Sequence, residues 1–185
     1  MQQLIRGAGG GTKQFELNQA TAMLATTPGT LDAMLRNQSP AWLNARKAPG
    51  AFSPLDVLGH LIHAEHTDWI PRVRIILEHG DSRAFEPFDR FGFHELTANK
   101  DVGQLLDLFA ASRRECLQAL SDLGVGETEL GLYGVHPEQG RVTMRELLAA
   151  WVVHDLGHIA QIVKTMAGEY REAVGSWRSY LSILD

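Results

Sequence analysis

The stretch FSPLDVLGHLIHAEHTDWIPRVRIILEHG, residues 52–80, decides the fold class, because its apolar residues recur every three or four positions as they do in a helix. Ser53 is a candidate N-cap, Pro54 suits the first helical turn, and Asp56 completes a capping box. The stretch therefore predicts one long helix. Pro71 is expected to bend this helix near its middle.

Comparable patterns on both sides of this stretch predict further helices. Residues 13–25 favour a first helix, and a new helix is expected to begin with Thr27 as its N-cap. Pro28 would then occupy the first helical position, where its missing N–H has no partner to lose. Later helices are expected at residues 101–124, 143–168 and 176–185, the last with Trp177, Tyr180, Leu181 and Leu184 on one apolar face.

Two segments between these helices have no helical pattern and are expected to be loops, namely residues 81–100 and 124–142. The first loop is rich in aromatic residues, which suits either a lid over a binding site or a cover for one end of the molecule. No segment carries a convincing strand pattern. With about five or six helices, the sequence predicts an all-α fold built as a helical bundle. The aromatic residues are Phe85, Phe88, Phe91 and Phe93.

Length and composition limit the classes of function. The 185 residues suit one domain at residues 13–185, preceded by a flexible, glycine-rich leader at residues 1–12. The 17 Lys and Arg residues are scattered and the net charge is −5, which argues against nucleic-acid binding. No apolar run reaches the roughly 18 residues of a membrane span. The single cysteine, Cys116, and the absence of a signal-peptide pattern favour a cytoplasmic protein.

The apolar segment AAWVVHDLGHIAQIVK, residues 149–164, contains His154 and His158, four residues apart. Four residues bring two side chains to one face of a helix, where both imidazoles can bind one ion or can serve as hydrogen-bonded polar groups of a core or groove. No glutamate lies between them, which disfavours a zincin protease. A catalytic ion usually takes a third protein ligand, and His60 lies on the apolar side of the earlier helix.

Each of these histidine segments also contains a glycine directly before a histidine. Gly59 precedes His60 and Gly157 precedes His158. Because glycine destabilises a helix, its presence suggests close approach of a ligand or of another helix. The sequence leaves both explanations open.

Three segments together resemble the DinB/YfiT-like superfamily, specifically its DinB_2-type branch. The similarity covers about residues 15–166, and its most specific part is His-x-x-x-His-x-x-Gln-Ile. The resemblance implies a DinB-like four-helix bundle with one divalent metal ion bound by His60, His154 and His158. Three imidazoles suit several ions, of which zinc or nickel is expected. The segments are AFSPLDVLGHLIHAEHTDWIPRV at 51–73, FAASRRECLQAL at 109–120 and GVHPEQGRVTMRELLAAWVVHDLGHIAQI at 134–162.

Members of the superfamily include thiol S-transferases, mycothiol-dependent isomerases and proposed hydrolases. The resemblance thus implies that the ion activates a low-molecular-weight thiol or water, for transfer to or hydrolysis of a small electrophilic substrate. The alternative is a non-catalytic, stress-associated helical protein that binds a partner or dimerises, with a structural metal or none. A homodimer is expected from family habit and from the apolar segment at residues 176–185.

Further polar residues are candidates for supporting roles. Gln161, three residues after His158, is expected to line the pocket or to hold a ligand imidazole. Glu65 is a candidate general base or outer support of the site. Asp155 is expected to bond a neighbouring helix or an arginine, and Arg113 to pair with a buried carboxylate or to meet an anionic substrate.

The remaining residues of these types are assigned no catalytic role. His136 is expected to shape the loop that contains it, and Cys116 is expected to act as a packed, inert side chain. Structural or solvent-exposed positions are expected for His63, His66, His79 and His94.

Overall fold

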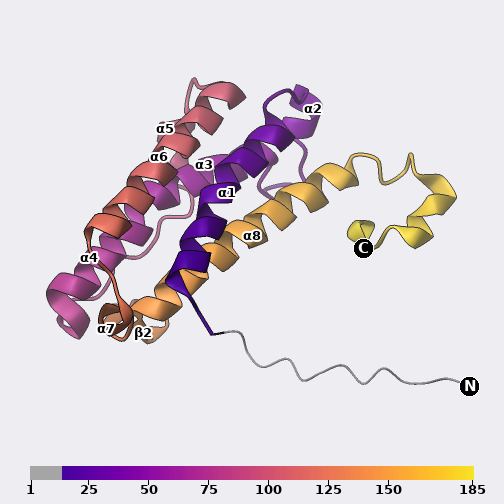
Figure 1. Ribbon diagram of the computed structural model, residues 1–185. Coiled ribbons are helices and arrows are strands. Elements are labelled where there is room, and N and C mark those ends of the chain that lie inside the picture. The colour runs from indigo at the N-terminus through magenta and orange to yellow at the C-terminus, as the bar shows by residue number, and fades with distance from the viewer. Residues whose placement is uncertain (1–13) are drawn as a thin grey trace, which may run out of the picture.

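The computed structural model describes residues 14–185, and the leader expected at residues 1–12 lies outside them. Four long helical segments run side by side in this part of the chain (Figure 1), which confirms the expected helical bundle. No helix among residues 14–185 has both the length and the apolarity that crossing a membrane requires. The segments are α1 (Leu17–Leu35), α3 (Pro54–Thr67) continued by α4 (Trp69–His79), α6 (Val102–Asp122) and α8 (Met144–Gly168).

Shorter elements lie between these helices and after the last of them. Two of them are strands, so the expectation that residues 124–142 form only a loop is wrong. β1 pairs antiparallel with β2, with Tyr133 opposite Thr143 and His136 opposite Gly140. The short elements are α2 (Pro40–Leu43), η1 (Gly80–Ser82), α5 (Phe93–Thr97), α7 (Glu127–Leu130), β1 (Tyr133–His136), β2 (Gly140–Thr143), η2 (Gly175–Tyr180) and η3 (Ser182–Leu184).

The hairpin is stabilised by contacts in its turn, and the alternation of apolar and polar residues does not reveal these contacts. The Nδ1 atom of His136 accepts hydrogen bonds from the main-chain N–H groups of Glu138 and Gln139, both at 3.2 Å, and so shapes the turn. Gly140 closes the turn with a φ of 72°, a conformation that favours glycine. A four-residue strand is too short to show a clear alternation of apolar and polar residues.

The first helix is continuous, so the expected restart at Thr27 is wrong. Thr27 is buried within α1 and Pro28 lies inside the helix. Because proline has no N–H group, the carbonyl four residues before it lacks its helical hydrogen-bond donor. Here that carbonyl belongs to Leu24. Arg113 donates a hydrogen bond from Nη1 to that oxygen at 2.8 Å. A residue on a distant helix therefore allows α1 to continue through Pro28.

The stretch at residues 52–80 forms two helices rather than one bent helix. The capping box at its start is present, because Ser53 Oγ accepts from Asp56 N–H and the Asp56 carboxylate accepts from Ser53 N–H. The interruption lies at Asp68, which ends α3 and precedes α4. Pro71 falls in the first turn of α4, where its missing N–H is tolerated, and the break therefore lies three residues before the expected bend.

The last long helix begins and ends as expected. Thr143 and Glu146 form the capping box of α8, with Thr143 Oγ1 accepting from Glu146 N–H at 3.1 Å, and Gly168 is the last helical residue. The segment after it differs from the prediction. It forms two 3-10 turns, and Trp177 and Tyr180 are exposed rather than part of a buried apolar face.

Candidate metal centre

His60 on α3 meets His154 and His158 on α8 where these two helices face each other. The Nε2 atom of His154 lies 3.1 Å from the Nε2 atom of His60 and 3.1 Å from that of His158. One nitrogen from each residue lies within 4.8 Å of the other two. His60 is buried, and the other two imidazoles are partly buried. Two residues from α8 and one from α3 therefore converge, and their role as metal ligands stays a prediction.

The spacing of the nitrogens fits a bound ion. With metal–nitrogen bonds of about 2.0–2.1 Å, a tetrahedral ion sets its nitrogen ligands about 3.3 Å apart, close to the separations here. As hydrogen bonds, the two contacts would have to share the single proton or the single lone pair on His154 Nε2. An ion would instead accept one lone pair from each imidazole. The donor set fits a divalent ion such as zinc or nickel.

The electrostatic environment keeps these imidazoles neutral, which is the form that binds metal. Burial and, to a smaller extent, the neighbouring His158 lower the pKa of His60 to about 4. Burial likewise lowers the pKa of His154 to about 3, assisted by the charges of His158 and His60. Burial is also the main cause of the lowered pKa of His158. At neutral pH all three imidazoles are available as ligands.

Gln161 contacts one of the three imidazoles directly. Its side-chain oxygen lies 2.9 Å from the Nδ1 atom of His158, one helical turn away. With a proton on Nδ1, the Nε2 lone pair of His158 is free to face the other two histidines. The Nδ1 atoms of His60 and His154 are buried and have no hydrogen-bond partner among residues 14–185.

Aromatic side chains surround the imidazoles. The rings of Phe52 and Phe88 lie 5.8 Å and 5.3 Å from the ring of His60, and the Trp69 ring lies 5.2 Å from that of His154. Phe88 comes from the segment between η1 and α5, which therefore covers the histidines. Such walls exclude water and strengthen electrostatic interactions inside the site.

The other aromatic residues of that segment pack against other elements or face solvent. The Phe85 ring lies against Gly134 of β1, whereas Phe93 packs closely on Gly59 of α3. Phe91 is half exposed. A Cβ atom at Gly59 would lie 2.8 Å from Phe93 Cδ2, so this glycine allows α5 to approach α3. Around Gly157 the described residues leave open space, so close packing of another helix does not explain that glycine.

Glu65 lies in a buried ion-pair network. Its two carboxylate oxygens accept from Arg113 Nε at 2.9 Å and Nη2 at 2.7 Å, and Trp151 Nε1 donates to Oε1 at 3.2 Å. Arg113 also donates to Asp155 at 2.7 Å, so the arginine expected for Asp155 and a buried carboxylate expected for Arg113 are both present. Burial raises the pKa of Glu65, and the Arg113 guanidinium opposes that shift. No hydrogen bond within residues 14–185 joins Glu65 to the three histidines, so its role as a base stays a prediction.

The other histidines of α3 do not join the cluster. The His63 ring packs 5.3 Å from the ring of Phe88, and His66 Nε2 lies 2.8 Å from Ser112 Oγ. Sequence reasoning missed Phe52 and Trp69 as walls of the centre. Both lie within the motif segment at residues 51–73 but outside α3, which carries His60, and no local pattern distinguishes them from ordinary core residues.

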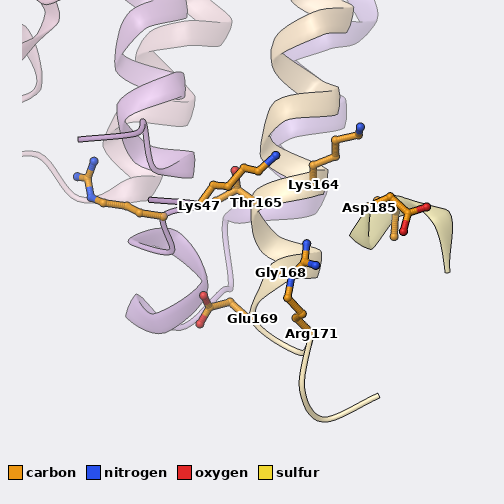
Figure 2. A pocket seen from close by; sticks show the side chains of 9 residues that line it. Lys47, Lys164, Thr165, Gly168, Glu169, Arg171 and Asp185 are labelled. Atoms are coloured by element: carbon orange, nitrogen blue, oxygen red, sulfur yellow. The ribbon is translucent and has the colours of Figure 1, made fainter. Parts of the chain in front are cut away.

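A separate cavity of about 210 Å³ lies beyond the metal centre, where α8 ends. Figure 2 shows Lys47, from the segment after α2, reaching towards Thr165 on α8, with Lys164 and Arg171 also in its lining. The lining contains none of the three histidines. This basic cavity is therefore distinct from the candidate metal centre.

Comparison with known proteins gives a family and a fold. Residues 23–162 match the family described as the DinB superfamily. Over 88% of this chain and 94% of the other, the structure is similar to YfiT from Bacillus subtilis, with 18% identity and a TM-score of 0.71. YfiT is described as a probable metal-dependent hydrolase with an unusual four-helix bundle topology. TT2238, described as a four-helix bundle protein, has 20% identity and a TM-score of 0.52 over 78% of this chain and 96% of its own. No curated protein matches the sequence.

Proposed function

This chain belongs to the DinB superfamily, and from that premise we propose that it is a metal-dependent enzyme whose divalent ion is bound by His60, His154 and His158. The convergence of three Nε2 atoms from two helices carries the proposal. Three ligands also distinguish a catalytic site from a structural one, which usually has four. The proposed ion is zinc or nickel.

An ion with three protein ligands supplies an open position at which the pKa of water or of a thiol falls. The residues of the chain provide the rest of the site. Gln161 orients the His158 imidazole, and the rings of Phe88 and Trp69 limit access of bulk water. We infer a reaction in which a low-molecular-weight thiol or water attacks a small electrophilic substrate.

The buried carboxylates near His154 support the binding of a cation. Two carboxylates, those of Glu65 and Asp155, surround the single guanidinium of Arg113. Both carboxylates bond this one guanidinium, and Asp155 directly follows His154 in α8. A carboxylate next to the imidazoles favours a positive ion there, because opposite charges attract strongly in a buried environment.

Two forms of the reaction follow from the ligand set. Three neutral imidazoles leave the charge of a divalent ion uncompensated, which favours an anionic attacking atom such as a thiolate sulfur. The description of YfiT as a probable hydrolase supports attack by water instead. Glu65 is retained in this proposal only as an outer support of the site, because its oxygens already bond Arg113 and Trp151.

A second candidate function rests on the surface of α8. Val153 and Leu156 are 67% and 46% exposed, and Met23 on the neighbouring α1 is 45% exposed. We propose that this apolar face joins a second copy of the chain. In the alternative function the chain is a non-catalytic binding or dimerisation protein, and a metal, if present, is structural. The proposed cytoplasmic location suits either function.

Metal analysis of purified protein beside the variant His154→Ala tests the enzyme proposal. The wild type is expected to contain about one equivalent of metal, and the variant to lose it while keeping its helical circular dichroism. The control variant is His79→Ala, which removes a histidine from the end of α4 and should keep the metal. Thermal unfolding before and after chelation then separates the two functions. Unfolding on chelation would favour a structural metal, and a wild type without metal after refilling would overturn both metal roles.

A further inference from the structure

The segment between η1 and α5 brings a positive charge to the metal centre. Phe88 in this segment covers His60, and Arg90 follows two residues later. The guanidinium carbon of Arg90 lies 5.3 Å from the ring centroid of Phe52 and 5.2 Å from that of Phe91. Two aromatic rings therefore hold the guanidinium in place, since arginine stacks favourably on aromatic faces.

Arg90 differs from the other arginines near the site in having no acidic partner. Arg113 is buried between Glu65 and Asp155, and Arg72 pairs with Asp68. Arg90 is exposed, and no carboxylate within residues 14–185 forms an ion pair with it. Its hydrogen-bonding fork is therefore available to a ligand.

The Phe52 ring links Arg90 to one of the three histidines. This ring lies 5.8 Å from the His60 ring and 5.3 Å from the Arg90 guanidinium carbon. The guanidinium is therefore one aromatic ring away from His60, and Arg90 is not itself a member of the histidine cluster.

We propose that Arg90 is the anion-recognition residue of the metal centre, binding a carboxylate, phosphate or sulfonate group on the small molecule that reaches the ion. This inference rests on the proposed metal-dependent function and narrows its substrate class to anions. The planar fork of arginine matches such groups with two parallel hydrogen bonds. A molecule that carries an anionic group beside its reacting atom would be held between Arg90 and the three histidines.

Binding of paired thiols to cobalt-loaded protein tests the inference. Each pair has one chain length and ends in either a carboxylate or an alcohol: mercaptoacetate with mercaptoethanol, mercaptopropionate with mercaptopropanol, and mercaptohexanoate with mercaptohexanol. Calorimetry measures the affinity, and the absorption of cobalt reports whether sulfur reaches the ion. The wild type is expected to bind the acid of at least one pair about tenfold more tightly than the alcohol.

The variants assign that preference to one residue. Arg90→Gln is expected to abolish the preference while keeping alcohol affinity, and Arg90→Lys to retain part of it. The control Arg83→Gln removes the same charge from the same segment. Within residues 14–185, Arg83 forms no hydrogen bond, ion pair or ring contact with the three histidines. This variant should therefore keep the full preference for the acid.

Each outcome bears on one proposal or the other. Equal binding of acids and alcohols by the wild type, or a preference that survives Arg90→Gln, overturns the inference. A loss of acid and alcohol affinity together in Arg90→Gln also overturns it, because Arg90 would then only hold Phe52 in place. An acid preference that depends on Arg90, without any change in cobalt absorption, supports anion recognition and counts against thiol activation. Protein that takes up no cobalt overturns both proposals.

Discussion

Arg113 donates a hydrogen bond to the main-chain carbonyl of Leu24, although the two residues are 89 positions apart. Pro28 leaves that carbonyl without its helical donor. The same guanidinium bonds Glu65 on α3 and Asp155 on α8. One buried cation on α6 therefore connects the four long helices, and it does so beside the segment that carries His154.

Replacing this cation should destabilise the whole bundle. The variant Arg113→Met leaves two buried carboxylates without their cation, and we expect the free energy of unfolding to fall by about 3–5 kcal/mol. The matched control is Arg114→Met, which removes the neighbouring exposed arginine and should change stability by less than about 0.5 kcal/mol. Urea denaturation followed by circular dichroism measures both. A fall below about 1 kcal/mol for Arg113→Met would contradict the role of the network.

Pro28 and Arg113 should be energetically coupled through the Leu24 carbonyl. In Pro28→Ala, residue 28 regains an N–H group that can bond this carbonyl within α1. The cost of Arg113→Met should then be smaller by about 1 kcal/mol than in the wild type, since one buried acceptor keeps a donor. A double-mutant cycle of urea denaturation measures the difference. Additive effects of the two substitutions would show that the Arg113 contact does not substitute for the missing helical bond.

The same contact explains what sequence reasoning could and could not predict. The starts of α3 and α8 were predictable because a capping box such as Ser53–Asp56 lies within four residues. The continuity of α1 through Pro28 depends on Arg113, far away in sequence, so no local pattern contains it. The hairpin depends on the His136 side chain in its turn.

For the site as well, some features follow from local sequence spacing and others depend on residues far apart in the chain. The spacing of His154 and His158 fixes their common face on one helix, whereas the apolar side of its helix and the family resemblance together selected His60 from the three histidines of α3. The aromatic loop was expected to cover either a site or one end of the molecule, and Phe88 of this loop covers His60. The contact of Phe52 with His60 could not be predicted, because it depends on the path of the chain before α3.

Two glycines that look alike in the sequence should respond in opposite ways to substitution by alanine. A Cβ atom at Gly59 would lie 2.7 Å from Thr97 Cγ2 and 2.8 Å from Phe93 Cδ2, so Gly59→Ala should destabilise the protein by about 1–3 kcal/mol. Gly157 lies within α8 with open space around it, so Gly157→Ala should stabilise by up to about 1 kcal/mol. Urea denaturation of both variants measures the contrast, and equal signs would contradict the packing of α5 on α3.

Gln161 should contribute to metal affinity without being a ligand. Replacing it in Gln161→Leu removes the hydrogen bond to His158 Nδ1, and we expect zinc affinity to fall about 10–100-fold while the helical fold is kept. Lys164→Leu is the control, since it changes an exposed side chain one turn further along α8. Competition with a chromophoric chelator measures both affinities. Unchanged affinity in Gln161→Leu would show that the imidazole is held by its helix alone.

Metal binding should release few protons in weakly acidic solution. Protons and metal compete for the same imidazole lone pairs, so a lowered pKa moves that competition to lower pH. Burial brings the pKa of His60 to about 4 and that of His154 to about 3, so both are already unprotonated at a pH of about 6.

We therefore expect zinc binding to release fewer than about one proton at a pH of about 6, whereas three imidazoles of ordinary pKa would release about two. Calorimetry in buffers of different ionisation enthalpy counts these protons. His79→Ala, outside the cluster, should give the wild-type count. A release of about two protons would mean that the metal-free histidines are solvated and charged at that pH, and that the aromatic walls around His60 and His154 do not exclude water before the ion binds.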